Sequence, residues 1–204
     1  MIITSIQQTT PGRMTILLDN GEVINSTLVV TTDLLLYSGK ELDESGLSEI
    51  KTASVRSLAV DKSIEYISRK MMSAHELKKK LIEKGHSEDT ADYCVDKLTQ
   101  LGLINDFEYA KALASHYANR GYGPARIKNE LIRHGIHREY YDEILEDVTV
   151  NEDRIKKIIS MKLKDPTDRA QLKKTIDALY RRGFSWDEIK SAISNYTNSI
   201  EEYQ

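Results

Sequence analysis

Hydrophobic positions recur at helical spacing from about residue 45 onwards, and three stretches share one arrangement. They are LKKKLIEKGHSEDTADYCV (77–95), IKNELIRHGIHREYYDEIL (127–145) and TIDALYRRGFSWDEIKSAI (175–193). Each has a central glycine, with a leucine four residues before it and an aliphatic residue ten residues after it. Both flanking segments are therefore predicted to be amphipathic helices. The glycines, which end the first helix of each pair in the left-handed conformation, are Gly85, Gly135 and Gly183.

A further helix is predicted ahead of each pair, so that each repeat is a three-helix unit of about 48–50 residues, since the glycines lie 50 and 48 residues apart. The extra helices are predicted at 62–72, 106–120 and 152–164. Helix start signals agree with this division. Ser73 and Glu76 form a predicted capping box, Asn105 and Glu108 offer the same arrangement, and Pro124 stands at a first helical position.

The N-terminal part has a β-rich pattern. Asp19-Asn20-Gly21 separates two β-prone runs and predicts a hairpin, because these residues tolerate the positive φ of a tight turn. Residues 2–6 are predicted to supply a third strand. The run TTDLLLYSG predicts a short helix that is capped by Thr31 or Thr32 and ends at Gly39.

The expected fold is mainly α: three tandem three-helix repeats in an elongated, curved array, preceded by a small β-rich segment. The predicted domains are 1–57 for the segment with the hairpin and the short helix, then 58–104, 105–150 and 151–204 for the repeats. A unit of this size buries little apolar surface alone, so neighbouring repeats are expected to share interfaces. A repeated surface suits a long or repetitive partner.

Composition favours a soluble protein of the cytoplasm. Hydrophobic residues make up 40% and charged residues 30% of the 204-residue chain. No apolar run approaches the roughly 18–20 residues that span a bilayer, and no membrane contact is expected. Cys94 is the single cysteine, so no internal disulfide can form, and its apolar helical surroundings predict a buried structural thiol.

The net charge of −3 argues against a protein that depends on strong binding to DNA phosphates. Residues 1–57 carry −3, residues 58–150 carry −2 and residues 151–204 carry +2. Any contact with nucleic acid is therefore expected from local patches or through a protein partner.

The sequence predicts no catalytic residues, no metal site and no cofactor. The five histidines lack metal-ligand spacing, and GYGPAR lacks the strand and the Gly-Lys-Ser/Thr sequence of a phosphate-binding loop. The carboxylates form no obvious acid–base pair. The chain is therefore not expected to be an enzyme.

Basic clusters precede each glycine and supply the candidate contact residues. One interpretation is a basic strip that touches phosphates or an acidic protein. The other is that cations in a helix's last turn complement its dipole. That dipole does not explain Arg126 and Lys174, nine residues before their glycines, although the first unit has Glu76 there. The candidate contacts are Arg120, Tyr122, Arg126, Arg133, Lys174, Arg181 and Arg182.

Two aromatic residues have alternative interpretations. Tyr122, beside Arg120 and Gly121, is favoured to fill the gap between two helices, and stacking on a partner remains open. Trp186 is likewise favoured as a packing residue between helices over a stacking platform.

Taken together, these motifs resemble the RecX family of recombination regulators. They are Ser73-x-x-Glu76-Leu77-x-x-x-Leu81-x-x-x-Gly85, LINDFEYA (103–110), RGYGPARIKNEL (120–131) and LYRRGFSWDEI (179–189). The resemblance covers about residues 58–200. The β-rich segment and LLLYSGKELD (34–43) are similar to the longer members.

The resemblance implies a cytoplasmic bacterial protein that binds the RecA recombinase and RecA–single-stranded-DNA filaments. It also implies restraint of strand exchange, ATP hydrolysis and coprotease action, in homologous recombination, DNA repair and the SOS response. The candidate residues would contact RecA or DNA, with single-stranded DNA a secondary and weak partner of a monomer. Many family members are basic, and this chain departs from them.

Two other classes remain open. A tandem helix-turn-helix DNA regulator shares the topology of helices around a glycine corner, and it predicts duplex binding with a steep salt dependence. A structural adaptor is the third reading.

Overall fold

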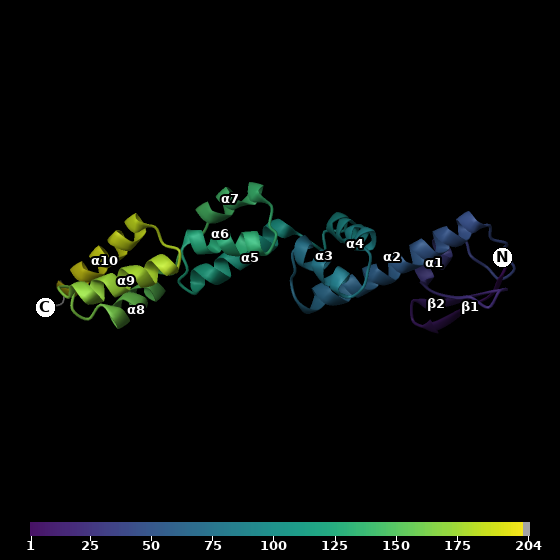
Figure 1. Ribbon diagram of the computed structural model, residues 1–204, viewed down its shortest axis with the longest axis horizontal. Helices are drawn as coiled ribbons and strands as arrows, with labels where there is room; N and C mark the ends of the chain where they lie inside the picture. Colours follow the sequence, from purple (N-terminus) through teal and green to yellow (C-terminus); the bar gives the residue numbers. More distant parts are fainter. Residues whose placement is uncertain (202–204) are drawn as a thin grey trace. The chain divides into compact units, whose positions relative to one another are not determined.

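The chain forms two compact units, residues 1–104 and residues 105 onwards. The structure, a computed structural model, describes the backbone of residues 1–201 and the side chains of residues 1–198. The N-terminal sheet and the helices of each repeat are shown in Figure 1. None of the helices in the described part of the chain is both long and apolar enough to cross a membrane.

A three-stranded antiparallel sheet opens the first unit. Its strands β1 (Ile3–Thr10), β2 (Arg13–Leu18) and β3 (Val23–Thr27) follow one another in space as in sequence. The predicted hairpin is confirmed: Gly21 has φ 81°, and the side chain of Asn20 accepts a hydrogen bond from the Glu22 N–H at 2.9 Å. The predicted third strand exists and runs further than expected, to Thr10.

Helix α1 (Leu28–Asp33) follows β3 directly, so the predicted cap at Thr31 or Thr32 and the predicted end at Gly39 are both wrong. Thr27 is the cap and accepts from the Val30 N–H at 3.3 Å. The hydroxyls of Thr31 and Thr32 instead donate to the Leu28 carbonyl at 2.9 Å, as they do inside a helix.

Helix α2 (Glu44–Arg69) has 26 residues and begins well before the helix predicted at 62–72. Its first half places Leu47 and Ile50 in the core of the sheet, and its second half places Ala59 and Tyr66 in the core of the first repeat. The boundary predicted between residues 57 and 58 therefore falls inside one continuous helix.

Two shorter helices complete the first repeat, α3 (Ala74–Glu83) and α4 (Glu88–Gln100). The predicted capping box is confirmed. Ser73 accepts from the Glu76 N–H at 3.1 Å, and the Glu76 carboxylate accepts from the Ser73 N–H at 3.3 Å. The repeat closes around a buried apolar cluster that includes Leu77, Leu81, Cys94 and Leu98.

The second unit contains the second and third repeats. Its helices are α5 (Asp106–Asn119), α6 (Pro124–Arg133), a 3-10 turn (Arg138–Tyr140), α7 (Tyr141–Glu146), α8 (Glu152–Lys162), α9 (Arg169–Arg181) and α10 (Trp186–Glu201). The helices predicted at 106–120 and 152–164 agree within two residues. The prediction of a mainly α fold, with three three-helix repeats after a β-rich segment, is confirmed.

The three glycine corners share one backbone geometry. Gly85, Gly135 and Gly183 have φ of 90°, 70° and 87°, which confirms the predicted left-handed helix ends. The N–H that follows each glycine donates to the carbonyl of the leucine four residues before that glycine, at 3.1, 3.0 and 3.3 Å. These bonds close the carbonyl ends of α3, α6 and α9 and turn the chain into the next helix.

Candidate interaction surface

Four of the seven predicted contact residues lie where the second and third repeats meet. Arg120, Tyr122 and Arg126 come from the α5–α6 connection and the start of α6, and Arg182 ends α9. The Gly123 N–H donates to the Arg182 carbonyl at 2.8 Å. The sequence did not predict this direct backbone contact, because nothing in the local pattern marks residues 59 positions apart as neighbours.

The Arg182 side chain belongs to the junction. Its Nη1 donates to the carbonyls of Arg120 and Gly121 at 3.1 and 3.3 Å, and its Cζ lies 5.0 Å from the centre of the Tyr122 ring. Tyr122 also meets Tyr117 edge to face, with ring centres 5.5 Å apart. The half-buried Tyr122 therefore fills the gap between helices, as the packing interpretation expected.

Arg126 and Arg133 share a buried partner that the sequence reasoning missed. Glu130, 3% exposed, has Oε1 2.7 Å from Arg126 Nη2 and Oε2 2.6 Å from Arg133 Nη2. The second contact is an ion pair, since Oε2 accepts no well-aligned hydrogen bond from the described residues. The two arginine side chains remain 45% and 65% exposed, so they can reach a partner while they neutralise Glu130.

Three of the candidate cations have exposed side chains. Lys174 and Arg181 are exposed on α9, and Arg120 is exposed with its Nη1 3.3 Å from His116 Nε2. Backbone N–H groups of Gln171 and Ala170 hold the pKa of the Asp168 carboxyl below its usual range, and Lys174 adds to this lowering. The unit thus presents cations on both sides of the junction.

Trp186 does not pack between helices, so that prediction is wrong. Its side chain is 60% exposed. Phe184 and Ile189 occupy the core of the third repeat instead. Ser185 and Glu188 cap the start of α10 reciprocally, with the Ser185 N–H donating to the Glu188 carboxylate at 2.6 Å. This cap places Trp186 at the first, outward-facing position of the helix.

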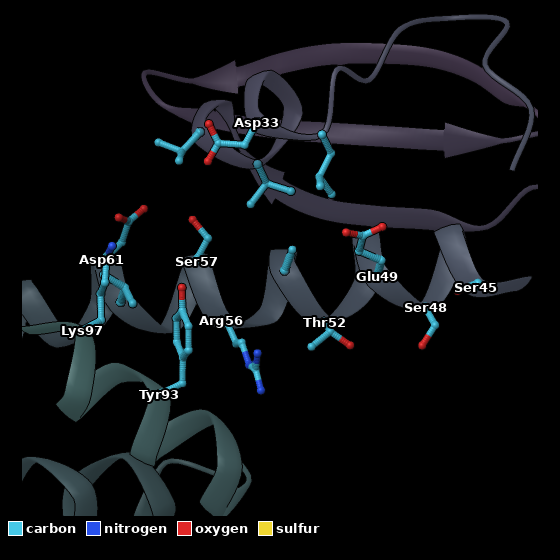
Figure 2. Close-up of a pocket in the computed structure, with 15 residues that line it drawn as sticks. Asp33, Ser45, Ser48, Glu49, Thr52, Arg56, Ser57, Asp61, Tyr93 and Lys97 are labelled. Carbon is cyan, nitrogen blue, oxygen red and sulfur yellow. The ribbon is translucent and has the colours of Figure 1, made fainter.

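A hollow of about 700 Å³ lies in the first unit between α1, α2 and α4. Figure 2 shows Ser57 and Asp61 pointing from α2 towards α1, which carries Asp33. Arg56 of α2 and Tyr93 of α4 also line the hollow, and the Arg56 guanidinium lies 4.8 Å from the centre of the Tyr93 ring. These groups come from three separated segments, which is why no local motif revealed the hollow.

The described residues offer neither a cluster of metal ligands nor a reactive thiol. No group of three histidine, cysteine, aspartate or glutamate side chains among them could hold a metal ion. Cys94 is fully buried, as predicted, and burial raises the pKa of its thiol against the opposing effects of Ser63 and Arg56. A thiol of this kind does not act as a nucleophile.

Tandem three-helix units define the class of protein: a helical repeat protein. Comparison with known families gives the particular family. Residues 59–98, 105–145 and 152–193 match the first, second and third three-helix domains of RecX. The chain belongs to the RecX family.

Individual relatives support the same family assignment. The regulatory protein RecX of Xanthomonas citri is 35% identical over 138 residues, 65% of this chain and 84% of the relative. That of Bacillus velezensis is 29% identical over 210 residues, 97% of this chain and 78% of the relative. Because these relatives are regulatory proteins, the prediction that the chain is not an enzyme is confirmed.

Solved structures extend the similarity to the fold. A crystal structure of regulatory protein RecX has a TM-score of 0.81 and 27% identity, covering 95% of this chain and 98% of the other. RecX from Lactobacillus salivarius has a TM-score of 0.58 and 27% identity, covering 71% of this chain and 98% of the other.

Proposed function

We propose that the chain binds the RecA recombinase, above all RecA filaments on single-stranded DNA, and inhibits strand exchange, ATP hydrolysis and coprotease action. The observation that carries the proposal is the match of all three repeats, in order, to the three domains of RecX. The protein acts in the cytoplasm as a monomer, and single-stranded DNA is a secondary partner.

The proposed contact surface is the cationic face around the junction in the second unit. Arg120, Lys174 and Arg181 offer exposed charge. Arg126 and Arg133 pair with the buried Glu130, and their side chains remain 45% and 65% exposed for contact with a partner. Tyr122 and Arg182 hold the junction in shape and contact the partner only at its edge. A net charge of −3 favours carboxylate-bearing protein surfaces over bare DNA as the main target.

The proposed mechanism is the bridging of neighbouring RecA subunits. A repeat protein that contacts several subunits resists the conformational cycle coupled to ATP, because that cycle changes the distances between subunits. Inhibition would then result from the bridging itself, and the protein would catalyse no reaction.

The primary test measures ATP hydrolysis by RecA of the same organism on single-stranded DNA while the protein is titrated from far below stoichiometric amounts. Inhibition at low ratios indicates that one molecule halts many subunits. Inhibition only near saturation indicates stepwise occupation of the filament. No effect at any ratio overturns the proposal, and tight, steeply salt-dependent duplex binding would then favour the DNA-regulator class.

Charge reversal tests the surface. Arg120→Glu, Lys174→Glu and Arg181→Glu together are expected to weaken inhibition about tenfold or more, since each loses an attraction and gains a repulsion. The matched control reverses three exposed lysines elsewhere in the third repeat, Lys157, Lys164 and Lys190. If both triple variants weaken inhibition equally, the change in net charge, and not the loss of this surface, is the cause.

A further inference from the structure

Each glycine corner carries a large apolar side chain in solvent. The residue three positions before the glycine is Ile82 in the first repeat, Ile132 in the second and Tyr180 in the third. Their exposed fractions are 44%, 54% and 70%. The preceding residue in each repeat is the corner leucine, which is at most 1% exposed.

The three side chains occupy one and the same backbone position. The carbonyl of each accepts the N–H of the corner glycine, at 2.9 Å for Ile82, 3.0 Å for Ile132 and 2.9 Å for Tyr180. Because this bond and the φ of the glycine are shared, each side chain leaves its helix in the same direction relative to its own corner.

A cation follows each apolar residue within two positions. Lys84 follows Ile82, Arg133 follows Ile132, and Arg181 follows Tyr180, all of them exposed. Among the described residues, Lys84 and Arg181 take part in no ion pair, whereas Arg133 forms an ion pair with Glu130. Each corner thus combines apolar surface with positive charge.

The fold does not require this apolar residue. The corner depends on the glycine and on the buried leucine, and a polar side chain at the exposed position would leave both unchanged. Single exposed apolar residues need no explanation. An exposed apolar residue at the same position in all three repeats, with a cation beside it each time, indicates a shared use.

We propose that the exposed apolar side chains at the three corners are contact points for successive identical subunits of a protein polymer. Each corner inserts its apolar side chain into an apolar pocket that is edged by carboxylates, which pair with Lys84, Arg133 and Arg181. The assignment rests on the proposed function, in which a RecA filament supplies identical subunits in series. Linked weak contacts of this kind sum to a strong one.

The chemistry favours a protein over a nucleic acid at these corners. Bases stack on aromatic rings and arginine planes, and an isoleucine side chain offers no such plane. Two of the three positions are isoleucine, so only the third corner, with Tyr180 and the nearby Trp186, is suited to stacking. An aliphatic residue next to a cation instead matches an apolar protein pocket with an acidic rim.

The test replaces Ile82, Ile132 and Tyr180 by serine, singly and together. Each single change is expected to raise the concentration for half-inhibition of RecA ATP hydrolysis about fivefold or more. The triple change is expected to raise it about a hundredfold or more, because linked contacts multiply. Thermal unfolding should stay within a few degrees of the parent, since all three side chains are exposed.

Matched controls replace exposed apolar residues away from the glycine corners of the three repeats, Val55, Leu103 and Met161, by serine. They remove similar apolar area from the surface without touching Gly85, Gly135 or Gly183. Half-inhibition should change less than twofold in each control.

Four outcomes decide the matter. Loss of inhibition at all three corners, with the controls unchanged, supports the proposal. Unchanged inhibition in the triple variant overturns it while leaving the proposed function intact. An effect at Tyr180 alone, accompanied by weaker binding to single-stranded DNA without RecA, overturns it in favour of a stacking surface. If the parent protein neither binds nor inhibits RecA filaments, the proposed function fails, and this assignment fails with it.

Discussion

Gly123 and Gly183 meet backbone to backbone, and their contact joins the second repeat to the third. The N–H of Ala125 donates to the Gly183 carbonyl at 3.2 Å, beside the bond from Gly123 to Arg182. A Cβ atom on Gly123 would lie 2.5 Å from the Gly183 oxygen. The contact therefore needs the smallest residue on both sides.

Gly123→Ala is expected to destabilise the second unit by about 1–3 kcal/mol, because the added methyl group collides with rigid backbone. Urea unfolding followed by circular dichroism measures the change. Gly46→Ala is the control, since its Cβ would meet only side chains, nearest the Asp43 Oδ1 at 3.1 Å, and its cost should stay within about 1 kcal/mol. Equal stability of Gly123→Ala and the parent would contradict the close approach.

Reversing Arg126 and Arg133 together should damage the fold as well as any contact. With both changed to glutamate, buried Glu130 faces two like charges, and a loss of about 1–3 kcal/mol is expected because the arginines are half exposed. Adding Glu130→Gln should recover part of this loss in chemical denaturation. If it recovers none, the cost does not come from the buried carboxylate.

Asp168 should make stability depend on pH in the acid range. Its folded-state pKa is lowered by the N–H groups of Gln171 and Ala170, so ionised Asp168 stabilises the fold above its unfolded pKa of about 3.9. That contribution is lost as the pH falls through the lower, folded pKa. Asp168→Asn keeps a capping side chain and removes the titration. Melting temperatures between pH 6 and pH 2 should therefore fall less steeply in the variant than in the parent.

Cys94 should react slowly with a thiol reagent in the folded protein. Its side chain is fully buried, and burial raises the pKa of the thiol, so little reactive thiolate is exposed. Labelling with a chromogenic disulfide in buffer and in concentrated urea measures the protection. Fast labelling without denaturant would show that α4 does not shield the thiol.

Local signals predicted the helical part of this fold well. The corner glycines, the Ser73 capping box and Pro124 each act within one turn of backbone, so that the sequence around them is enough. The start of α1 was misplaced because Thr27, Thr31 and Thr32 can all cap a helix, and the end of β3 decides between them.

Long-range contacts limited the prediction of the site. The exposure of Trp186 follows from Phe184 and Ile189 taking the core positions, a competition that periodicity alone does not resolve. Periodicity also does not reveal the role of Arg182, because its partners Arg120 and Gly121 lie about sixty residues earlier in the chain. Charge patterns found the cations but did not separate those that serve the fold from those left for a partner.

Helix α2 couples the sheet to the first repeat mechanically, because one continuous helix contributes to both apolar clusters. Its outer half offers Ile50 to the sheet and buries Ser54, whose hydroxyl donates to the Ser26 hydroxyl at 2.8 Å. Without the strands, these positions would face water. Substitutions within residues 44–58 are therefore expected to disturb the sheet and the first repeat together, because both cores pack on one continuous helix.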